Sequence, residues 1–239
     1  MEIDGKIICP RCELDKANVE FEKKIQEEVK LEQAEMNYNT LLKKSIIEDE
    51  TLLKARIHNY MTREKEEITN KHTIENAVRD YLKGEPFNLV LQGNAGVGKS
   101  HLAYAVLHEL NETKKYSCLF ISIEAMLRKI KASFNDKQSR YTEEYFNRLL
   151  SEVDYLVLDD LGAETGAIST DKTATDFVQR VLYGIATSRQ SKSTILTTNL
   201  SSETLFNMYD KKLVSRLLKN PRIVVFKTTK DKRINTLGF

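Results

Sequence analysis

Residues 93–100 read Gly-Asn-Ala-Gly-Val-Gly-Lys-Ser, a glycine-rich loop that ends in a lysine and a serine. The glycines allow backbone angles that turn several N–H groups toward one anion and let the chain approach it closely. Lys99 can place its charge on the β- and γ-phosphates of a nucleotide, and the Ser100 hydroxyl can bind Mg²⁺. A helix predicted over residues 100–110 would point its positive N-terminal end at the same phosphates. The pattern predicts a site for ATP and Mg²⁺, with nucleotide contacts from Gly93, Asn94, Ala95, Gly96, Val97, Gly98, Lys99, Ser100 and His101.

Short apolar runs lie on both sides of this loop along the chain. They alternate with longer segments of helical periodicity, which is the pattern of a parallel sheet buried under helices. The five runs are Leu89–Leu91, Cys118–Ile121, Tyr155–Leu158, Thr194–Thr197 and Ile223–Phe226. We therefore predict an α/β domain over residues 71–239, with the glycine-rich loop between its first strand and first helix.

Polar residues follow two of these strands. Asp159 and Asp160 end one apolar run, and Asn199 ends the next run after two threonines. Because ligands bind at the carboxyl ends of strands in open α/β sheets, these side chains are expected near the glycine-rich loop. Asp159 would hold Mg²⁺ through water, Asp160 would polarise the attacking water, and Asn199 would orient that water or contact the γ-phosphate. The alternative is that these residues only cap a helix or begin a turn.

The C-terminal region is basic, with nine lysines or arginines and one acid between Lys211 and Arg233. Most such charges lie on solvated surface. Two arginines stand apart, because Arg216 lies on a predicted helix before the last strand and Arg233 follows that strand. They are the best candidates for stabilising the charge that develops in phosphoryl transfer.

Residues 1–70 have a different residue pattern from the predicted α/β domain. Between Leu14 and Ile68 there is neither proline nor glycine, and apolar residues recur at helical spacing among glutamates and lysines. This predicts two or three amphipathic helices, followed by a further helix from Thr73 to Lys83. So thin a segment cannot bury its own apolar stripe. We expect it either to bind a partner protein or to pack as a hairpin on the α/β domain.

Together these motifs resemble the AAA+ P-loop ATPases of the initiator clade. Among them the chain is most similar to the DnaC/DnaI-type replicative helicase loaders, with the IstB-type transposition ATPases as a sister group. The resemblance covers about residues 75–239 and is carried by the loop at 93–100, Asp159-Asp160-Leu161-Gly162-Ala163-Glu164, Thr197-Thr198-Asn199, Ser215-Arg216-Leu217 and Lys232-Arg233.

This resemblance implies a five-stranded parallel sheet of order 5-1-4-3-2, preceded by a small helical N-terminal domain. It also implies that Asn199 is the sensor 1 residue and Arg233 the sensor 2 arginine. Arg216 would be an arginine finger that acts on the nucleotide of a neighbouring subunit, so self-association is expected.

The segment between the second predicted strand and Asp159 is longer than one crossover helix needs. Residues 124–152 resemble the extra helix of initiator-clade ATPases, which helps those proteins grip single-stranded DNA. Basic and aromatic side chains are interleaved there, as on single-strand binding surfaces. These candidate DNA contacts are Lys129, Lys131, Phe134, Lys137, Arg140 and Tyr141. The alternative is an amphipathic helix with Phe134 and Tyr141 packed inward.

The motif Cys9-Pro10-Arg11-Cys12 resembles one knuckle of the zinc-binding head of DnaI-type loaders. A structural Zn²⁺ needs four ligands, and the sequence contains no second Cys-x-x-Cys. Cys9 and Cys12 are therefore either part of a zinc site completed from elsewhere in the fold or from another chain, or a degenerate remnant.

Composition sets the remaining limits. The chain has 239 residues, a formal net charge of +2 and three cysteines, which do not form a disulfide framework and favour a reducing, cytoplasmic setting. No apolar stretch approaches the length of a membrane span. The resemblance implies an ATPase that loads a hexameric, DnaB-type replicative helicase onto single-stranded DNA, with residues 1–70 binding the helicase. The alternatives are an IstB-like helper that presents DNA to a transposase, and a helicase- or loader-binding module with a vestigial ATPase.

Overall fold

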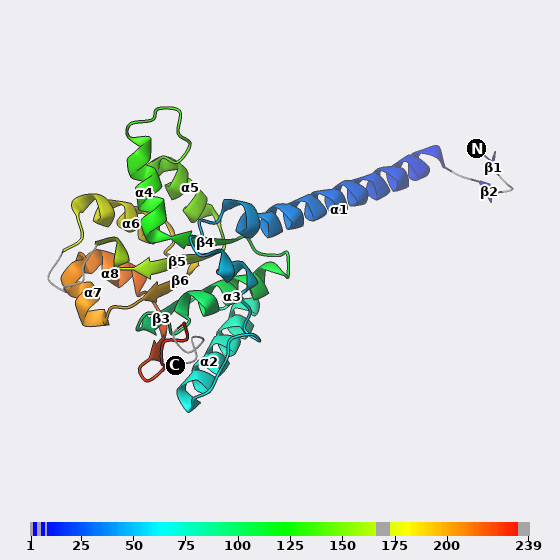
Figure 1. Ribbon diagram of the computed structural model, residues 1–239. Helices are drawn as coiled ribbons and strands as arrows, with labels where there is room; N and C mark the ends of the chain where they lie inside the picture. Colours follow the sequence, from blue (N-terminus) through cyan, green and yellow to red (C-terminus); the bar gives the residue numbers. More distant parts are fainter. Residues whose placement is uncertain (1, 4–5, 8, 166–172, 234–239) are drawn as a thin grey trace.

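The computed structural model describes residues 2–3, 6–7, 9–165 and 173–233, so residues 166–172 and 234–239 of the predicted α/β domain lie outside the described residues. Its centre is a parallel sheet whose strands run β4-β5-β6-β3-β7 in space (Figure 1). The strands are β3 (Asn88–Gly93), β4 (Cys118–Ser122), β5 (Tyr155–Leu161), β6 (Ser193–Thr198) and β7 (Pro221–Phe226). The predicted order 5-1-4-3-2 is this arrangement read from the other edge, so the predicted fold class is confirmed.

Helices cover both faces of the sheet, which explains why the apolar runs of β3, β4 and β5 are buried. Alternate residues of a strand point to opposite faces. Leu89 and Leu91 join a buried cluster with helices α2 and α3, whereas Val90 between them joins a second cluster with helices α4 to α8. These helices are α2 (Lys65–Leu82), α3 (Lys99–Asn111), α4 (Ile123–Ser133), α5 (Glu143–Glu152), α6 (Asp176–Ser188), α7 (Ser202–Met208) and α8 (Lys211–Leu217).

The N-terminal region is dominated by helix α1 (Pro10–Lys44), a single helix of 35 residues that projects from the α/β body (Figure 1). A small antiparallel pair, β1 (Glu2–Ile3) and β2 (Lys6–Ile7), precedes it. The C-terminal end of α1 reaches the body, where Leu41 is buried in the cluster that contains α2 and α3.

Helix α1 ends at Lys44, although the predicted helical pattern continues beyond it. Beyond it Ile46 forms a parallel bridge with Ile121 on the free edge of β4, and the chain continues through a short 3₁₀ helix, η1 (Glu50–Lys54). The prediction of α-helix across Leu53, Ile57 and Met61 was therefore wrong. Contacts with the α/β body override the local periodicity here, because Ile57 is buried in a core cluster while in a turn.

Helix α2 begins at Lys65 rather than at the predicted Thr73 and runs without interruption through residue 70. A carboxylate fixes its start, since Glu67 accepts the N–H of Glu64 at 3.0 Å. The division of the chain near residue 70 stays a proposal. The buried contacts of residues 41–60 mean that a partner surface in this region must lie mainly on the projecting part of α1.

Candidate nucleotide site

The glycine-rich loop joins β3 to α3 and closes around the N-terminal end of that helix. Gly96 and Gly98 have φ angles of 77° and 95°, which residues with a Cβ rarely adopt. Close neighbours also exclude a side chain at Gly98, where a Cβ would lie 2.6 Å from Cε2 of Tyr60. At Gly96 a Cβ would overlap the carboxylate of Asp231. The loop thus has the backbone form that suits the phosphates of a nucleotide.

Lys99 reaches back across this loop. Its Nζ donates hydrogen bonds to the carbonyl oxygens of Gly93 at 2.9 Å and Asn94 at 2.8 Å, and to Oδ1 of Asn199 at 2.6 Å. Burial lowers the pKa of Lys99, and the two acids at the end of β5 oppose that shift. The ammonium group therefore lies between the loop and the end of β6, where phosphate oxygens would compete for its donors.

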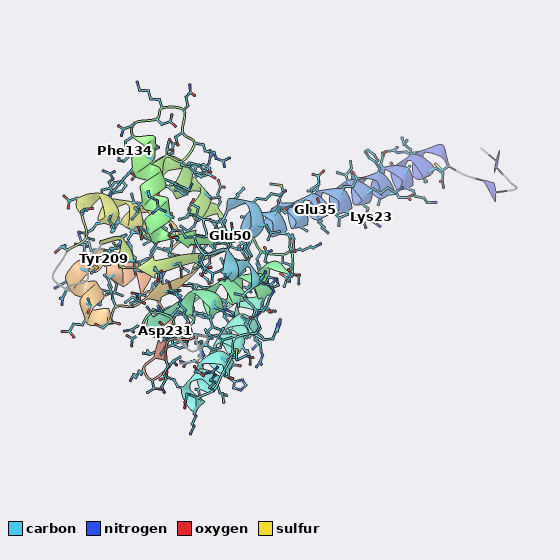
Figure 2. The ribbon with its side chains drawn as sticks, in the orientation of Figure 1. Lys23, Glu35, Glu50, Phe134, Tyr209 and Asp231 are labelled. Atoms are coloured by element: carbon cyan, nitrogen blue, oxygen red, sulfur yellow. The ribbon has the colours of Figure 1, made fainter. Side chains whose placement is uncertain are left out.

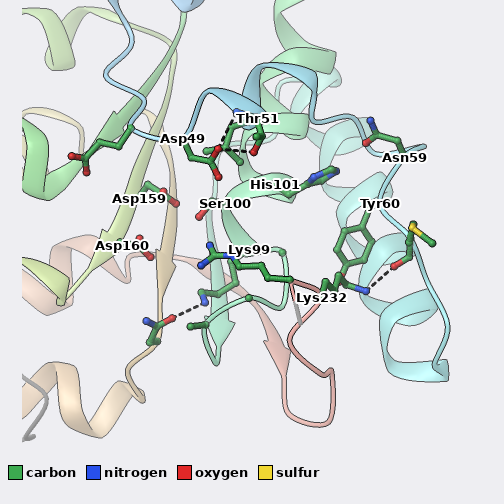
Figure 3. Close-up of a pocket in the computed structure, with 18 of the residues that line it drawn as sticks. Asp49, Thr51, Asn59, Tyr60, Lys99, Ser100, His101, Asp159, Asp160 and Lys232 are labelled. Atoms are coloured by element: carbon green, nitrogen blue, oxygen red, sulfur yellow. Dashed lines mark hydrogen bonds between the residues drawn. The ribbon is translucent and has the colours of Figure 1, made fainter. Parts of the chain in front are cut away.

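Asp159 lies in the same pocket and is 7% exposed (Figure 3). Its Oδ1 accepts a 2.6 Å hydrogen bond from the Thr197 hydroxyl, and Ser100 lines the same pocket. Burial, with the neighbouring charge of Asp160, raises the pKa of Asp159 to about 6, although the hydroxyls of Thr197 and Ser100 and the charge of Lys99 act to lower it. Ser100 and Asp159 present hard oxygen donors side by side, so they fit Mg²⁺, which would neutralise phosphate charge when bound.

Asp160 lies at a β-bulge. The pairing of β5 with β6 shifts between Leu158 and Leu161, and Asp160 has a left-handed φ of 59°. Its N–H donates to the Thr197 hydroxyl oxygen at 2.8 Å. Successive residues of a regular strand point to opposite faces, whereas the bulge lets Asp159 and Asp160 both line one cavity. Sequence alone gave no signal for the bulge.

The motif that begins at Asp159 ends at a third acid, Glu164, which makes contacts of its own. Glu164 accepts the N–H of Gly162 at 2.9 Å and is hydrogen-bonded to the Tyr209 hydroxyl, just after α7. Burial raises the pKa of Glu164 and that of Tyr209. Glu164 therefore ties the turn after β5 to the end of α7.

A cavity of about 660 Å³ extends from the loop to a wall that the sequence did not predict. That wall comes from residues 48–63 (Figure 3). The Tyr60 hydroxyl donates to the carbonyl of Val97 at 2.9 Å, and Nε2 of His101 donates to the carbonyl of Arg56 at 3.0 Å. Burial lowers the pKa of His101, which the sequence predicted as a nucleotide contact. The wall residues are Glu48, Asp49, Thr51, Leu52, Asn59, Tyr60, Met61 and Arg63.

One sequence signal could have located the start of this wall. Aspartate is a preferred residue at the beginning of a helix. The Asp49 carboxylate accepts the N–H of Thr51 at 3.0 Å and begins η1. An interruption of α1 before Asp49 was therefore predictable, whereas the contact with the glycine-rich loop was not.

The two candidate arginines lie in different places. Arg233 lines the cavity, and its sensor 2 role stays a prediction. Arg216 lies on α8, with its guanidinium 4.5 Å from the ring centre of Tyr183 and one N–H donated to the carbonyl of Lys212 at 3.1 Å. Among the described residues that line this cavity, Arg216 is not included, and its role as an arginine finger stays a prediction.

The candidate DNA contacts lie on the hairpin of α4 and α5, two helices where one crossover would suffice (Figures 1 and 2). Phe134 is 60% exposed and meets the edge of Phe177, with ring centres 5.7 Å apart. Tyr141 instead packs partly against the core, with Lys129 Nζ 4.5 Å and the Arg140 guanidinium 4.9 Å from its ring centre. The full set on this hairpin is Lys129, Lys131, Phe134, Lys137, Arg140 and Tyr141.

The candidate zinc ligands Cys9 and Cys12 are exposed at the start of α1. Among the described residues, no group of three or more histidine, cysteine, aspartate or glutamate side chains could hold a metal ion. The structure therefore provides no support for zinc at these cysteines. Among the helices of the described part of the chain, none has both the length and the apolar character that crossing a membrane requires.

Several proteins are similar to this chain in sequence. The chain is 29% identical over 146 residues to the uncharacterized protein YdaV of Escherichia coli K12, covering 60% of this chain and 54% of YdaV. It is 28% identical over 152 residues to the replicative helicase loader DnaC of the same strain, covering 62% and 58%. It is 36% identical over 93 residues to the replicative helicase loader DnaI of Bacillus subtilis, covering 37% and 28%. The chain thus spans little more than half the length of YdaV and DnaC.

Solved structures agree with the fold. The DnaC helicase loader superposes with a TM-score of 0.62 at 25% identity, covering 75% of this chain and all of that one. DnaI gives 0.61 at 24% identity, covering 77% and 96%, and AMPPCP-bound DnaA from Aquifex aeolicus gives 0.58 at 19% identity, covering 77% and 53%. The last two show the fold alone, which is that of AAA+ P-loop ATPases. The resemblance to DnaC/DnaI-type loaders is therefore confirmed.

A family model described as IstB-like ATP binding protein matches residues 18–227. The match runs from within α1 to the end of β7 and includes the glycine-rich loop, both acids of β5 and Asn199. The chain therefore belongs to the family of IstB-like ATP binding proteins.

Proposed function

We propose that this chain is an ATPase that loads a hexameric, DnaB-type replicative helicase onto single-stranded DNA. The observation that carries the loader assignment is helix α1, which projects from an ATP-binding body and exposes apolar side chains to solvent. The similarity to DnaC and DnaI supports the same assignment. Cytoplasmic localisation follows from this function as part of the proposal.

Five of the eight exposed large apolar residues of α1 fall on one helix face, and the other three, Val19, Leu31 and Leu42, lie off it. Phe21, Ile25 and Val29 are 64%, 44% and 57% exposed, and Leu14 and Met36 continue the same stripe at 62% and 64%. An isolated exposed leucine needs no explanation, but a continuous stripe marks a protein-binding surface. We propose that this stripe binds the helicase.

Charge substitutions in the full chain test this surface better than truncation. Deleting residues 1–70 would also remove Ile57 and Tyr60, which are buried in the body. Phe21→Asp and Ile25→Asp should abolish co-sedimentation with a purified helicase, because each places a carboxylate in an apolar contact. Gln26→Asp adds the same charge on another face of the same turn and should leave binding intact. Equal binding by all three variants would refute helicase docking on this stripe.

We further propose that the site hydrolyses ATP with Mg²⁺ held by Ser100 and Asp159. Asp160 would orient the attacking water, Asn199 would contact it or the γ-phosphate, and Arg233 would bind the phosphates. The support is that all five residues line one cavity with Lys99. Arg216 would come from a neighbouring subunit, so hydrolysis should be slow in monomers and should require self-association.

The tip of the α4–α5 hairpin is the proposed contact with single-stranded DNA. Phe134 is 60% exposed, and a base can stack on such a ring. Lysines and an arginine surround the tip and would pair with the phosphates. Tyr141 contributes through packing, since two cations already lie against its ring.

A second candidate function is a transposition helper, because the chain belongs to the family of IstB-like ATP binding proteins and its motifs resemble the IstB-type transposition ATPases. In that case double-stranded DNA, rather than single-stranded DNA, would stimulate oligomerisation with ATP. Light scattering with each DNA separates the two. A third alternative, a binding module with a vestigial ATPase, predicts that Lys99→Ala retains full activity.

A further inference from the structure

The chain turns back over the glycine-rich loop after β7, and residues 227–233 form what we call the C-terminal turn. One carboxylate holds its first half. Glu66, in the first turn of α2, accepts the N–H groups of Lys227, Thr228 and Thr229 at 3.1, 3.1 and 3.0 Å. It also accepts the hydroxyl of Thr229 at 2.7 Å. Three successive main-chain donors thus converge on a single side chain from the other end of the sequence.

The second half of the C-terminal turn is held by the next residue of α2. Lys232 Nζ donates to Glu67 at 2.6 Å and to the carbonyl of Met61 at 2.7 Å, and it lies 4.6 Å from the ring centre of Tyr60. The Lys232 N–H donates to the carbonyl of Gly96 at 2.9 Å. The turn is therefore joined both to α2 and to the phosphate-binding loop itself.

These contacts determine where Arg233 lies. It follows Lys232 directly and lines the cavity, whereas Glu66 is not among the described residues that line it. Burial works against the charge of Glu66, but the hydrogen bonds from Thr229, Thr228 and Lys227 lower its pKa to about 2. The carboxylate is thus ionised throughout the physiological range, and such charge-assisted hydrogen bonds are the strong ones.

We propose that Glu66 is a positioning residue for the nucleotide site, which fixes the C-terminal turn so that Arg233 meets the γ-phosphate of ATP. The proposal rests on the proposed ATPase function. Because Glu66 does not line the described part of the cavity and instead holds the C-terminal turn, its effect would pass through the turn. The competing view is that Glu66 only stabilises the fold, in which case nucleotide discrimination should not depend on it.

The experiment measures the affinities of the full chain for ATP and for ADP with Mg²⁺, by competition against a fluorescent ADP analogue. Arg233→Ala should reduce the preference for ATP over ADP by about tenfold or more, the usual value of a charge-assisted phosphate contact. Glu66→Ala should cause most of the same loss. The double variant should discriminate no worse than Arg233→Ala alone, because both changes remove one interaction.

Two further variants separate positioning from stability. Glu66→Gln keeps an oxygen that can accept the main-chain N–H groups, so it should retain an intermediate preference even if Glu66→Ala folds poorly. Glu85→Ala is the matched control, because Glu85 pairs with Arg222 at 3.0 Å at the opposite end of β7. It should leave the preference unchanged. Amide exchange at residues 227–229 should rise in Glu66→Ala and not in Glu85→Ala.

The possible outcomes are distinct. Full ATP preference in folded Glu66→Ala, or losses that add in the double variant, would overturn the positioning role while leaving the ATP site intact. Failure of the wild-type chain to bind ATP, or full preference in Arg233→Ala, would refute the proposed site and this inference together. The positioning role is supported if Arg233→Ala and Glu66→Ala each lose ATP preference, the losses do not add in the double variant, and Glu66→Gln retains part of the preference.

Discussion

Thr197 should be essential for the metal end of the site although it touches no phosphate in the proposed arrangement. It is fully buried on β6, and its hydroxyl makes two hydrogen bonds. The hydroxyl donates to Asp159 at 2.6 Å and accepts the N–H of Asp160 at 2.8 Å, at the residue with the left-handed φ. Thr197→Val keeps nearly the same shape and removes both bonds.

The size of the effect follows from these two bonds. A hydrogen bond to a charged group contributes about 1.5–3 kcal/mol, and an unsatisfied buried N–H costs about 1–3 kcal/mol. We expect Thr197→Val to lower the free energy of unfolding by about 2–4 kcal/mol, allowing for relaxation of the bulge. Thr197→Ser keeps the hydroxyl and loses one methyl group, which costs about 1 kcal/mol.

Stability and function are separated by a control on the neighbouring residue. Thr198 is also buried, and its hydroxyl donates to the carbonyl of Leu161 at 2.7 Å and accepts the N–H of Leu200 at 3.1 Å. Urea unfolding should show losses for both valine variants. Titration of nucleotide binding with Mg²⁺ should show a weakened Mg²⁺ dependence for Thr197→Val alone, with rescue by Thr197→Ser. An unchanged Mg²⁺ dependence in Thr197→Val, or an equal change in Thr198→Val, would refute the reasoning.

Three other predictions concern the remaining parts of the site. Burial raises the pKa of Asp159 from 3.8 to about 6, so its ionisation destabilises the fold as pH rises through that interval. Asp159→Asn should therefore raise the free energy of unfolding by up to about 3 kcal/mol at pH 8 without Mg²⁺ and by little at pH 4, as measured in urea. Arg216→Ala and Lys99→Ala should each lower the rate of phosphate release by about 10³-fold. A mixture of the two variants should recover part of the activity, because the proposed site takes residues from two subunits. A mixture no more active than either variant alone would exclude an arginine finger supplied by the neighbouring subunit. Phe134→Ala should weaken binding of a single-stranded oligonucleotide by about 5- to 100-fold in fluorescence anisotropy. Phe206, an exposed phenylalanine on α7, provides the control, and Phe206→Ala should not weaken oligonucleotide binding. Equal effects of the two substitutions would place the DNA elsewhere.

The sheet and the phosphate-binding residues were predictable because the apolar strand runs, the helical periodicity and the glycine-rich loop all indicated the same α/β arrangement. Each predicted strand lies within an observed one, and the loop at 93–100 stands between a strand and a helix as its glycines require. The strand order came from the resemblance rather than from the residues. It is confirmed by the observed order β4-β5-β6-β3-β7.

Tertiary contacts determine the parts that the sequence did not predict. Apolar residues such as Ile57 and Tyr60 recur at helical spacing, yet they are buried against α3 and the glycine-rich loop in a non-helical segment. The bulge at Asp160 depends on a hydroxyl from the neighbouring strand, 37 residues away along the chain. Neither feature has a local signature, since both depend on which segments meet in space.

Loading of a purified hexameric replicative helicase onto closed circular single-stranded DNA tests the proposed function most directly. With ATP and Mg²⁺, the wild-type chain should leave helicase on the DNA after the complex is isolated by gel filtration. Lys99→Ala and Phe21→Asp should both fail, the first at the nucleotide and the second at the partner, whereas Gln26→Asp should load normally. Helicase that reaches the DNA equally well without the chain, or with Lys99→Ala, would contradict an ATP-dependent loader.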